Sequence, residues 1–245
     1  MTSTFVRGVD RARHYARRPL ARTPYLWDLA MKVRPEKRAT LARPDTAIVI
    51  EGFLRSGNTY SVAAFQIANG PGPHIGRHLH GAPHVLRAVR MGLPTVVLIR
   101  HPGEAVLSYL IRRSTLTPYD ALVEYLDFYR TAWPARDGFV VGLFDRVTGD
   151  FGAIVDEVNQ RFGTTFRRFE RTPENEAAAF RLVEEMNRLE SGGEVVETHV
   201  GRPSEGRTRR KDELRALLEQ PRTAAKLREA ERLYDRYVQL TAERG

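Results

Sequence analysis

Residues 48–60 read IVIEGFLRSGNTY, and this stretch decides the fold. The apolar, β-branched run at residues 48–50 predicts a buried strand, because such runs are typical of strands covered on both faces. Gly52 follows the run, and a second glycine, Gly57, comes after four intervening residues. From there residues 61–68 have the composition of a helix. The stretch therefore predicts a strand, a glycine-rich turn and a helix in direct succession.

The spacing of the two glycines is that of a phosphate-binding P-loop, G-x-x-x-x-G-K-[ST]. Asn58 stands where that pattern has lysine, and the cationic side chain is Arg55, inside the turn. The backbone N–H groups of such a turn converge at the positive end of the helix dipole, and both glycines are expected to supply the positive φ that it needs. Arg55, Ser56 and Thr59 add donors for an anion. The alternative is a plain strand–turn–helix corner with a surface arginine.

Residues 93–104 read LPTVVLIRHPGE and repeat this architecture. A buried strand ends in Arg100, Pro102 suits the first turn of a helix, and Ser108 lies further along that helix. A Mg-dependent P-loop enzyme has an aspartate near the end of such a strand to help hold the metal. An arginine there repels Mg²⁺ and attracts an anion. Together the two segments predict a ligand with two separate anionic groups and no metal.

Residues 55–60, RSGNTY, resemble the 5′-phosphosulfate loop of the sulfotransferases, written K/R-S-G-[TS]-[TS]-[WF]. Residues 99–102, IRHP, with Ser108 in the following helix, resemble the 3′-phosphate motif of the same family, R-[ND]-P followed by a serine. Residues 77–79, RHL, resemble the segment that carries the catalytic histidine of its cytosolic branch. The resemblance covers about residues 46–115, with the three segments in the family's order.

The resemblance implies an enzyme with the P-loop NTPase-like sulfotransferase fold. Such an enzyme moves a sulfuryl group from 3′-phosphoadenosine-5′-phosphosulfate (PAPS) to a hydroxyl or amine of a small-molecule, lipid or glycan acceptor. The product nucleotide is adenosine 3′,5′-diphosphate (PAP), and no metal takes part. By this resemblance, the groups that hold the 5′-phosphosulfate are Arg55, Ser56, Gly57, Asn58 and Thr59.

The same resemblance assigns the 3′-phosphate to Arg100 and Ser108, and it places Tyr60 where the family has an aromatic ring that stacks on adenine. Sulfotransferases also close an R-K-G-x-x-G loop over the 3′-phosphate. This chain lacks the R-K-G triplet, so Arg202 or Arg207 is expected to take its part.

Residues 74–84, HIGRHLHGAPH, are dense in histidine. A base for sulfuryl transfer must take a proton near neutral pH, which suits an imidazole. His78 occupies the family's position and is the expected general base, with His80 as the second candidate; in a strand the two would face the same side. Arg55 would stabilise the charge that develops on the departing oxygen. The alternatives are a zinc site, although the chain has no cysteine, and loop histidines without a role.

The chain has 245 residues and a formal net charge of +9. Alternating strands and helices predict one three-layer α/β/α sandwich with a central parallel sheet at residues 45–245, preceded by a basic N-terminal arm at residues 1–44. The arm is expected to be solvated and to pack one aromatic turn onto the domain. The alternative is that it docks on an acidic membrane surface or an anionic acceptor. No run is apolar for the ~20 residues of a membrane span, and a cytoplasmic location is expected. The competing classes are a P-loop nucleotide kinase or hydrolase and a non-catalytic basic protein that binds anions or nucleic acid. No recognisable nucleic-acid-binding motif supports binding of nucleic acid.

Overall fold

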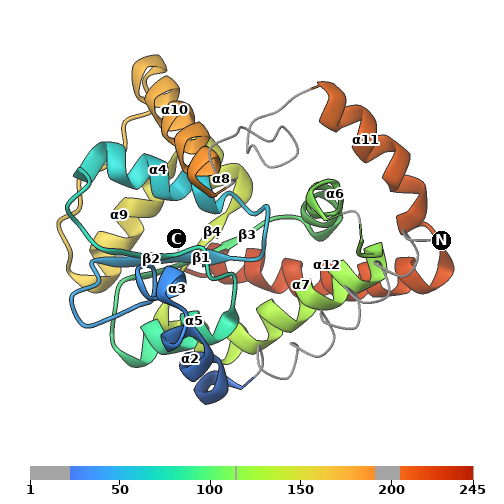
Figure 1. The fold of residues 1–245 in the computed structure, drawn as a ribbon, viewed down its shortest axis with the longest axis horizontal. Coiled ribbons are helices and arrows are strands. Elements are labelled where there is room, and N and C mark those ends of the chain that lie inside the picture. Colours follow the sequence, from blue (N-terminus) through green and yellow to red (C-terminus); the bar gives the residue numbers. More distant parts are fainter. Residues whose placement is uncertain (1–22, 114, 191–204, 245) are drawn as a thin grey trace.

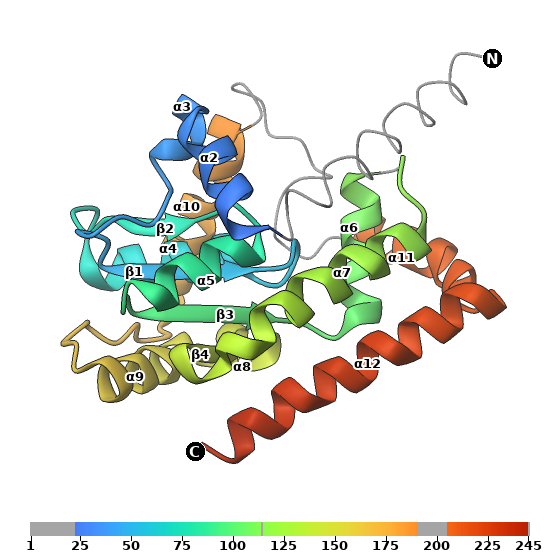
Figure 2. The ribbon, with the colours of Figure 1, turned by 90° about the horizontal axis from the view of Figure 1, so that it is seen from below.

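The computed structural model describes residues 23–113, 115–190 and 205–244. Its centre is a parallel sheet with the strand order β2-β1-β3-β4, as Figure 2 shows. The strands are β1 (Ile48–Gly52), β2 (Ile75–Arg77), β3 (Thr95–Ile99) and β4 (Val140–Leu143). In the register, Ile50 lies opposite Val96, and Leu98 lies opposite both Gly52 and Gly142. All pairs are parallel, so the carboxyl ends of β1, β3 and β4 meet at one edge of the sheet.

Helices cover both faces of the sheet (Figure 1). On one face lie α4 (Asn58–Asn69), α8 (Phe144–Gly149), α9 (Phe151–Phe162) and α10 (Pro173–Glu190). On the other lie α5 (Ala82–Arg90), α6 (Pro102–Arg112), α7 (Pro118–Ala132) and α12 (Pro221–Ala242). The remaining described elements are α2 (Pro24–Lys32), α3 (Pro35–Arg38), α11 (Glu205–Arg215) and the 3₁₀ turns η1 (Trp133–Gly138) and η2 (Ala216–Leu218). None of the described helices combines the length and apolarity needed to cross a membrane.

Alternate residues of the strands contribute to two apolar cores. Ile48, Ile50 and Leu98 pack with α4, α9 and α10, whereas Val97 and Ile99 pack with α5, α6, α7 and α12. Every residue of β1 and β3 is buried, as expected for parallel strands covered on both faces. The predicted three-layer α/β/α sandwich with a central parallel sheet is therefore confirmed.

The described residues before β1 contact the sheet and its loops. The N–H of Arg77, at the end of β2, donates to the carbonyl of Thr40 at 3.0 Å. The Trp27 ring on α2 is buried against Gly81, where an added Cβ would lie 2.8 Å from the indole Nε1. Residues 23–44 of the predicted arm thus include contacts with the domain. Residues 1–22 of the arm lie outside the described residues.

Gly52 ends β1 where the backbone of β3 approaches most closely. A Cβ built at this position would lie 2.4 Å from the carbonyl oxygen of Leu98, and a backbone atom cannot turn away as a side chain can. We expect Gly52→Ala to lower the free energy of unfolding by about 3 kcal/mol, the upper end of the usual cost of overpacking. In thermal denaturation this corresponds to a melting temperature lower by roughly 6–12 °C.

Gly72→Ala is the matched control for that substitution. Nothing lies within 4 Å of a Cβ at Gly72, so this variant should melt within about 2 °C of the wild type. Equal melting temperatures for the two alanine variants would contradict a tight β1–β3 contact at Gly52.

Candidate functional site

A cleft of about 630 Å³ lies at the carboxyl ends of β1, β3 and β4. Its lining comes from the turn after β1 and from helices α4, α6, α8, α10 and α11. In Figure 1, α6 and α11 lie to the right of the sheet, where β3 leads into α6. Ligands of parallel α/β folds bind at this edge, beyond the carboxyl ends of the strands. The cleft is therefore the candidate site.

The turn between β1 and α4 has the conformation of an anion-binding loop. Gly57, with φ 93°, is the N-cap of α4, so the first N–H groups of the helix border the turn. The Asn58 side chain donates from Nδ2 to the carbonyl of Phe53 at 3.0 Å and closes the turn. Asn58 thus holds the loop together at the position where an ordinary P-loop has its lysine.

One expectation about the glycines is wrong. The second left-handed residue of the turn is Arg55, with φ 70°, and not Gly52. Gly52 is required because of the close approach of β3, whereas the strained conformation falls on a residue that carries a side chain. A non-glycine residue held in this region costs of order 1 kcal/mol or more, and such residues cluster at functional sites.

The side chain of Tyr129, on α7, anchors the turn between β1 and α4. Its buried hydroxyl donates to the carbonyl of Leu98 at 2.7 Å and accepts the N–H of Phe53 at 3.3 Å. The Ser56 hydroxyl lies 3.4 Å from the same oxygen, and Ser56 is fully buried. Burial raises the pKa of Tyr129, so the ring remains a phenol at neutral pH. The Ser56 side chain is thus used inside the protein, whereas Gly57, Asn58, Thr59 and Tyr60 line the cleft.

The structure brings the two predicted anion-binding segments together. Arg55 donates from Nε to the hydroxyl of Ser108, on α6, at 3.0 Å. Arg100, just beyond β3, donates from Nη1 to the carbonyl of Arg55 at 3.4 Å. All three side chains line the cleft. The segments at residues 48–60 and 93–104 are well separated along the chain, and the structure joins them in a single site.

Arg100 is held in place by three groups around it. Its guanidinium lies 3.9 Å from the centroid of the Phe144 ring and 3.8 Å from a carboxylate oxygen of Glu104. The Tyr125 hydroxyl donates to its backbone carbonyl at 2.9 Å. Burial lowers the pKa of Arg100 from its ordinary value, and the charges of Glu104 and Asp145 oppose that shift. An arginine always remains protonated in proteins, so Arg100 supplies a fixed positive charge at this wall of the cleft.

Lys211, on α11, is a further cation of the cleft that the sequence analysis did not single out. Its Nζ lies 2.6 Å from Oε2 of Glu104, and Nη2 of Arg215 lies 3.4 Å from Oε1 of the same carboxylate. The family resemblance predicted Arg202 or Arg207 at this place. Arg202 lies outside the described residues, and so does the side chain of Arg207, whose backbone belongs to α11. Helix α11 thus brings a basic side chain to the cleft. Among the described side chains of this helix, it is that of Lys211.

Tyr60 forms part of an aromatic wall of the cleft. Its ring centroid lies 5.8 Å from that of Phe180, on α10, and 6.5 Å from that of Phe169. Both Tyr60 and Phe180 line the cleft. The flat, apolar faces of these rings are suited to an aromatic base.

The histidines of residues 74–84 lie in different surroundings. His80 lines the cleft, whereas His78 is not among the residues that line it. The strand β2 ends at Arg77, and His78 and His80 both have left-handed backbones, with φ 58° and 48°. Their rings still lie nearly parallel, with centroids 6.0 Å apart. His74 and His84 are turned toward Thr46 and Glu51, respectively. In the described part of the chain no group of three His, Asp or Glu side chains is arranged to hold a metal ion.

The protonation of the His80 ring follows from its contacts. Nδ1 lies 3.0 Å from the carbonyl oxygen of Gly52, which can only accept, so Nδ1 carries the proton and Nε2 is left with a lone pair. Burial lowers the pKa of His80 below its ordinary value; the charge of Glu51 opposes this shift and His78 adds to it. A neutral imidazole at neutral pH is the form that can accept a proton.

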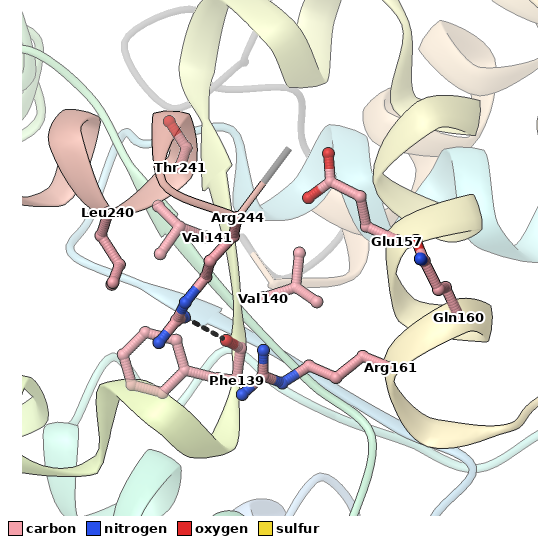
Figure 3. Close-up of a pocket in the computed structure, with 9 residues that line it drawn as sticks. All are labelled: Phe139, Val140, Val141, Glu157, Gln160, Arg161, Leu240, Thr241 and Arg244. Carbon is pink, nitrogen blue, oxygen red and sulfur yellow. Dashed lines mark hydrogen bonds between the residues drawn. The ribbon is translucent and has the colours of Figure 1, made fainter.

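A second cavity, of about 270 Å³, lies between the edge strand β4, α9 and the end of α12 (Figure 3). Its two arginines are engaged with protein groups. Arg161 donates to the carbonyl of Asp137, and Arg244 donates to the carbonyl of Phe139 at 3.5 Å and to the Asp137 carboxylate at 2.5 Å. This cavity lies away from the loops of the cleft and contains none of the predicted site residues.

No protein-family profile matches the chain, and no curated protein matches it. Among solved structures, it is similar to the mouse sulfotransferase SULT7A1 complexed with PAP. The identity is 12%, the TM-score is 0.40, and the match covers 77% of this chain and 89% of the mouse chain. The likeness is one of backbone course.

Proposed function

We propose that this protein is a sulfotransferase that moves a sulfuryl group from PAPS to a hydroxyl or amine of an acceptor. The observation that carries the proposal is the contact between Arg55 and Ser108, which unites two anion-binding segments in one cleft. His80 stands on the wall of the same cleft. Two cationic subsites beside an uncharged imidazole suit a donor with two anionic groups and an acceptor that must lose a proton.

The donor groups of the cleft fit PAPS, which supplies an activated sulfuryl group when bound. The turn before α4, with Arg55 and Thr59, would hold the 5′-phosphosulfate, because backbone amides at a helix N-terminus favour anions. Arg100, Ser108 and Lys211 would hold the 3′-phosphate through charge-assisted hydrogen bonds. Tyr60 and Phe180 offer aromatic faces to the adenine. The acceptor could be a small molecule, a lipid or a glycan.

In this mechanism His80 is the general base. Its Nε2 takes the proton of the acceptor hydroxyl, while Nδ1–H stays bonded to the carbonyl of Gly52 and fixes the ring. Arg55 and the amides of the turn stabilise the negative charge that develops on the departing oxygen. We prefer His80 to His78, the first choice from the sequence, because His80 lines the cleft.

Calorimetric titration with PAP tests the proposal directly. We expect wild-type protein to bind PAP equally well in EDTA and in Mg²⁺, and more tightly than it binds ATP with Mg²⁺. Arg100→Ala should weaken PAP binding by about 2–3 kcal/mol, or roughly 30- to 150-fold, because it removes charged hydrogen bonds to a phosphate.

Arg43→Ala is the matched control, since it removes the same charge from an exposed ion pair with Asp45. It should change PAP affinity less than twofold. A preference for Mg-ATP in the wild type would reject the sulfotransferase proposal and favour a P-loop kinase or hydrolase.

A further inference from the structure

A buried carboxylate, that of Glu51, lies near the end of β1, beside the loop that carries His80. Glu51 is fully buried, yet it belongs to a strand whose other side chains are apolar. A buried carboxylate is costly unless several hydrogen bonds compensate it. Each contact of Glu51 is therefore informative about why it is there.

Two of those contacts are consecutive backbone amides of the His80 loop. The N–H of Leu79 donates to Oε1 at 2.8 Å, and the N–H of His80 donates to Oε2 at 3.0 Å. Successive N–H groups that converge in this way form a nest for an anion. His78 and His80, in the same loop, have left-handed backbones, which are strained. The hydrogen bonds to Glu51 offset the cost of that strain.

The third contact is His84, on α5. Its Nδ1 lies 2.9 Å from Oε1 of Glu51, and its Nε2 accepts the N–H of Ala42 at 2.8 Å. Because Nε2 must offer a lone pair to that N–H, Nδ1 carries the proton and donates to Glu51. The Trp27 ring stacks on His84 at 5.8 Å and closes the network from outside. Glu51 therefore receives three donors.

We propose that Glu51 is a positioning residue for His80: its carboxylate holds the loop in its strained conformation through the amides of Leu79 and His80. The inference rests on the proposed function in so far as His80 is the base. The end of β1 then holds His80 twice, through the carboxylate of Glu51 on its backbone and through the carbonyl of Gly52 on its ring.

The residue type matters because each Glu51 oxygen faces N–H groups. In Glu51→Gln, the side chain keeps its size, but its NH₂ group must face at least one of those donors. The nest would open and the charge would be gone. Both changes act on His80 although Glu51 itself is not among the residues that line the cleft.

The charges around His80 decide the sign of the pH effect. Glu51 from β1 raises the pKa of His80, whereas His78 from the same loop and Arg112 from α6 lower it. His84 faces Glu51 from α5 and shields part of its charge. Burial is the largest cause that lowers this pKa, and the hydrogen bond to the carbonyl of Gly52 raises it. Removing the charge of Glu51 leaves burial, His78 and Arg112 opposed by that hydrogen bond alone, so the pKa of His80 should fall.

The test is an NMR titration of the His80 ring in wild type and in Glu51→Gln, with the signal assigned by its loss in His80→Gln. We expect the pKa of His80 to be lower in Glu51→Gln and the acid limb of the kcat profile to move to lower pH with it. We also expect kcat to fall roughly 10²-fold, as for a misplaced catalytic group, with PAP affinity within twofold. In Glu51→Asp, which keeps the charge, the pKa should lie nearer to that of the wild type.

Glu157→Gln, which neutralises a half-buried partner of Arg146 far from the loop, is the matched control and should leave both readings unchanged. An unchanged pKa of His80 in folded Glu51→Gln would overturn the proposal, even if the protein proves not to be a sulfotransferase, because the titration needs no donor or acceptor. If Glu51→Gln does not fold, hydrogen exchange of the wild type decides. The amides of Leu79 and His80 should be protected, and exchange at unprotected rates would overturn the proposal.

Discussion

Replacement of His80 by glutamine is expected to lower kcat roughly 10²- to 10⁴-fold, the usual contribution of a general base. Glutamine carries an amide that can donate a hydrogen bond, but it cannot take a proton at neutral pH. Because His80 does not belong to either predicted phosphate-binding segment, PAP affinity should change less than threefold. Initial rates with PAPS and a responsive acceptor, combined with PAP titration, measure the two effects separately.

His78→Gln is the matched control for this loss. The two histidines lie in one loop, with similar left-handed backbones and rings 6.0 Å apart, but only His80 of the pair lines the cleft. We expect less than a tenfold fall in kcat for His78→Gln. The reverse pattern, with His78→Gln inactive and His80→Gln active, would restore the order that the sequence favoured.

The pH profile gives a second reading of the same residue. A base must be unprotonated to act, so kcat rises as pH passes upward through its pKa. Burial lowers the pKa of His80, which places the acid limb below the ordinary value of about 6.5 for histidine. Activity should therefore be retained at slightly acidic pH and lost only on further acidification. An acid limb clearly above pH 6.5 would contradict His80 in this environment.

Much of the site could be predicted because its residues follow strand ends. The carboxyl ends of neighbouring parallel strands meet at one edge, so Arg55 after β1 and Arg100 after β3 had to lie close together. Apolar runs and glycine positions sufficed to locate those strands. The helix after each strand was likewise marked by its sequence, with Pro102 opening α6.

What could not be predicted depends on side-chain environment. Alternation along a strand suggested that His78 and His80 share a side, but β2 ends at Arg77 and the loop turns through left-handed conformations. Glu51 interrupts an apolar run, and nothing local indicates that its partners come from the loop and from α5. Lys211 reaches the cleft from α11, and its partner Glu104 lies 107 residues earlier in the chain. Such contacts are set by packing between distant elements, which a sequence pattern does not encode.

Arg55→Ala is expected to show the second large effect. The activation free energy should rise by about 3 kcal/mol, which lowers kcat more than 10²-fold. The guanidinium belongs to the turn between β1 and α4, and its Nε is fixed by Ser108 at 3.0 Å. In the proposed mechanism the departing oxygen would gain charge at this turn. An alanine at φ 70° bears the same kind of backbone strain as arginine, since both have a Cβ, so the turn itself should persist. Rates at saturating PAPS isolate this loss from any change in affinity.

Arg55→Lys and Arg100→Ala separate charge stabilisation from binding. Lysine keeps a positive charge but not the planar fork or the bond to Ser108, so kcat should recover only partly. Arg100, which is stacked on Phe144 and bonded to the backbone of Arg55, should act mainly on PAP affinity. If Arg55→Ala lowered affinity as much as Arg100→Ala and left kcat within threefold, Arg55 would be a binding residue. The stabilisation of the departing oxygen would then fall to the backbone amides of the turn.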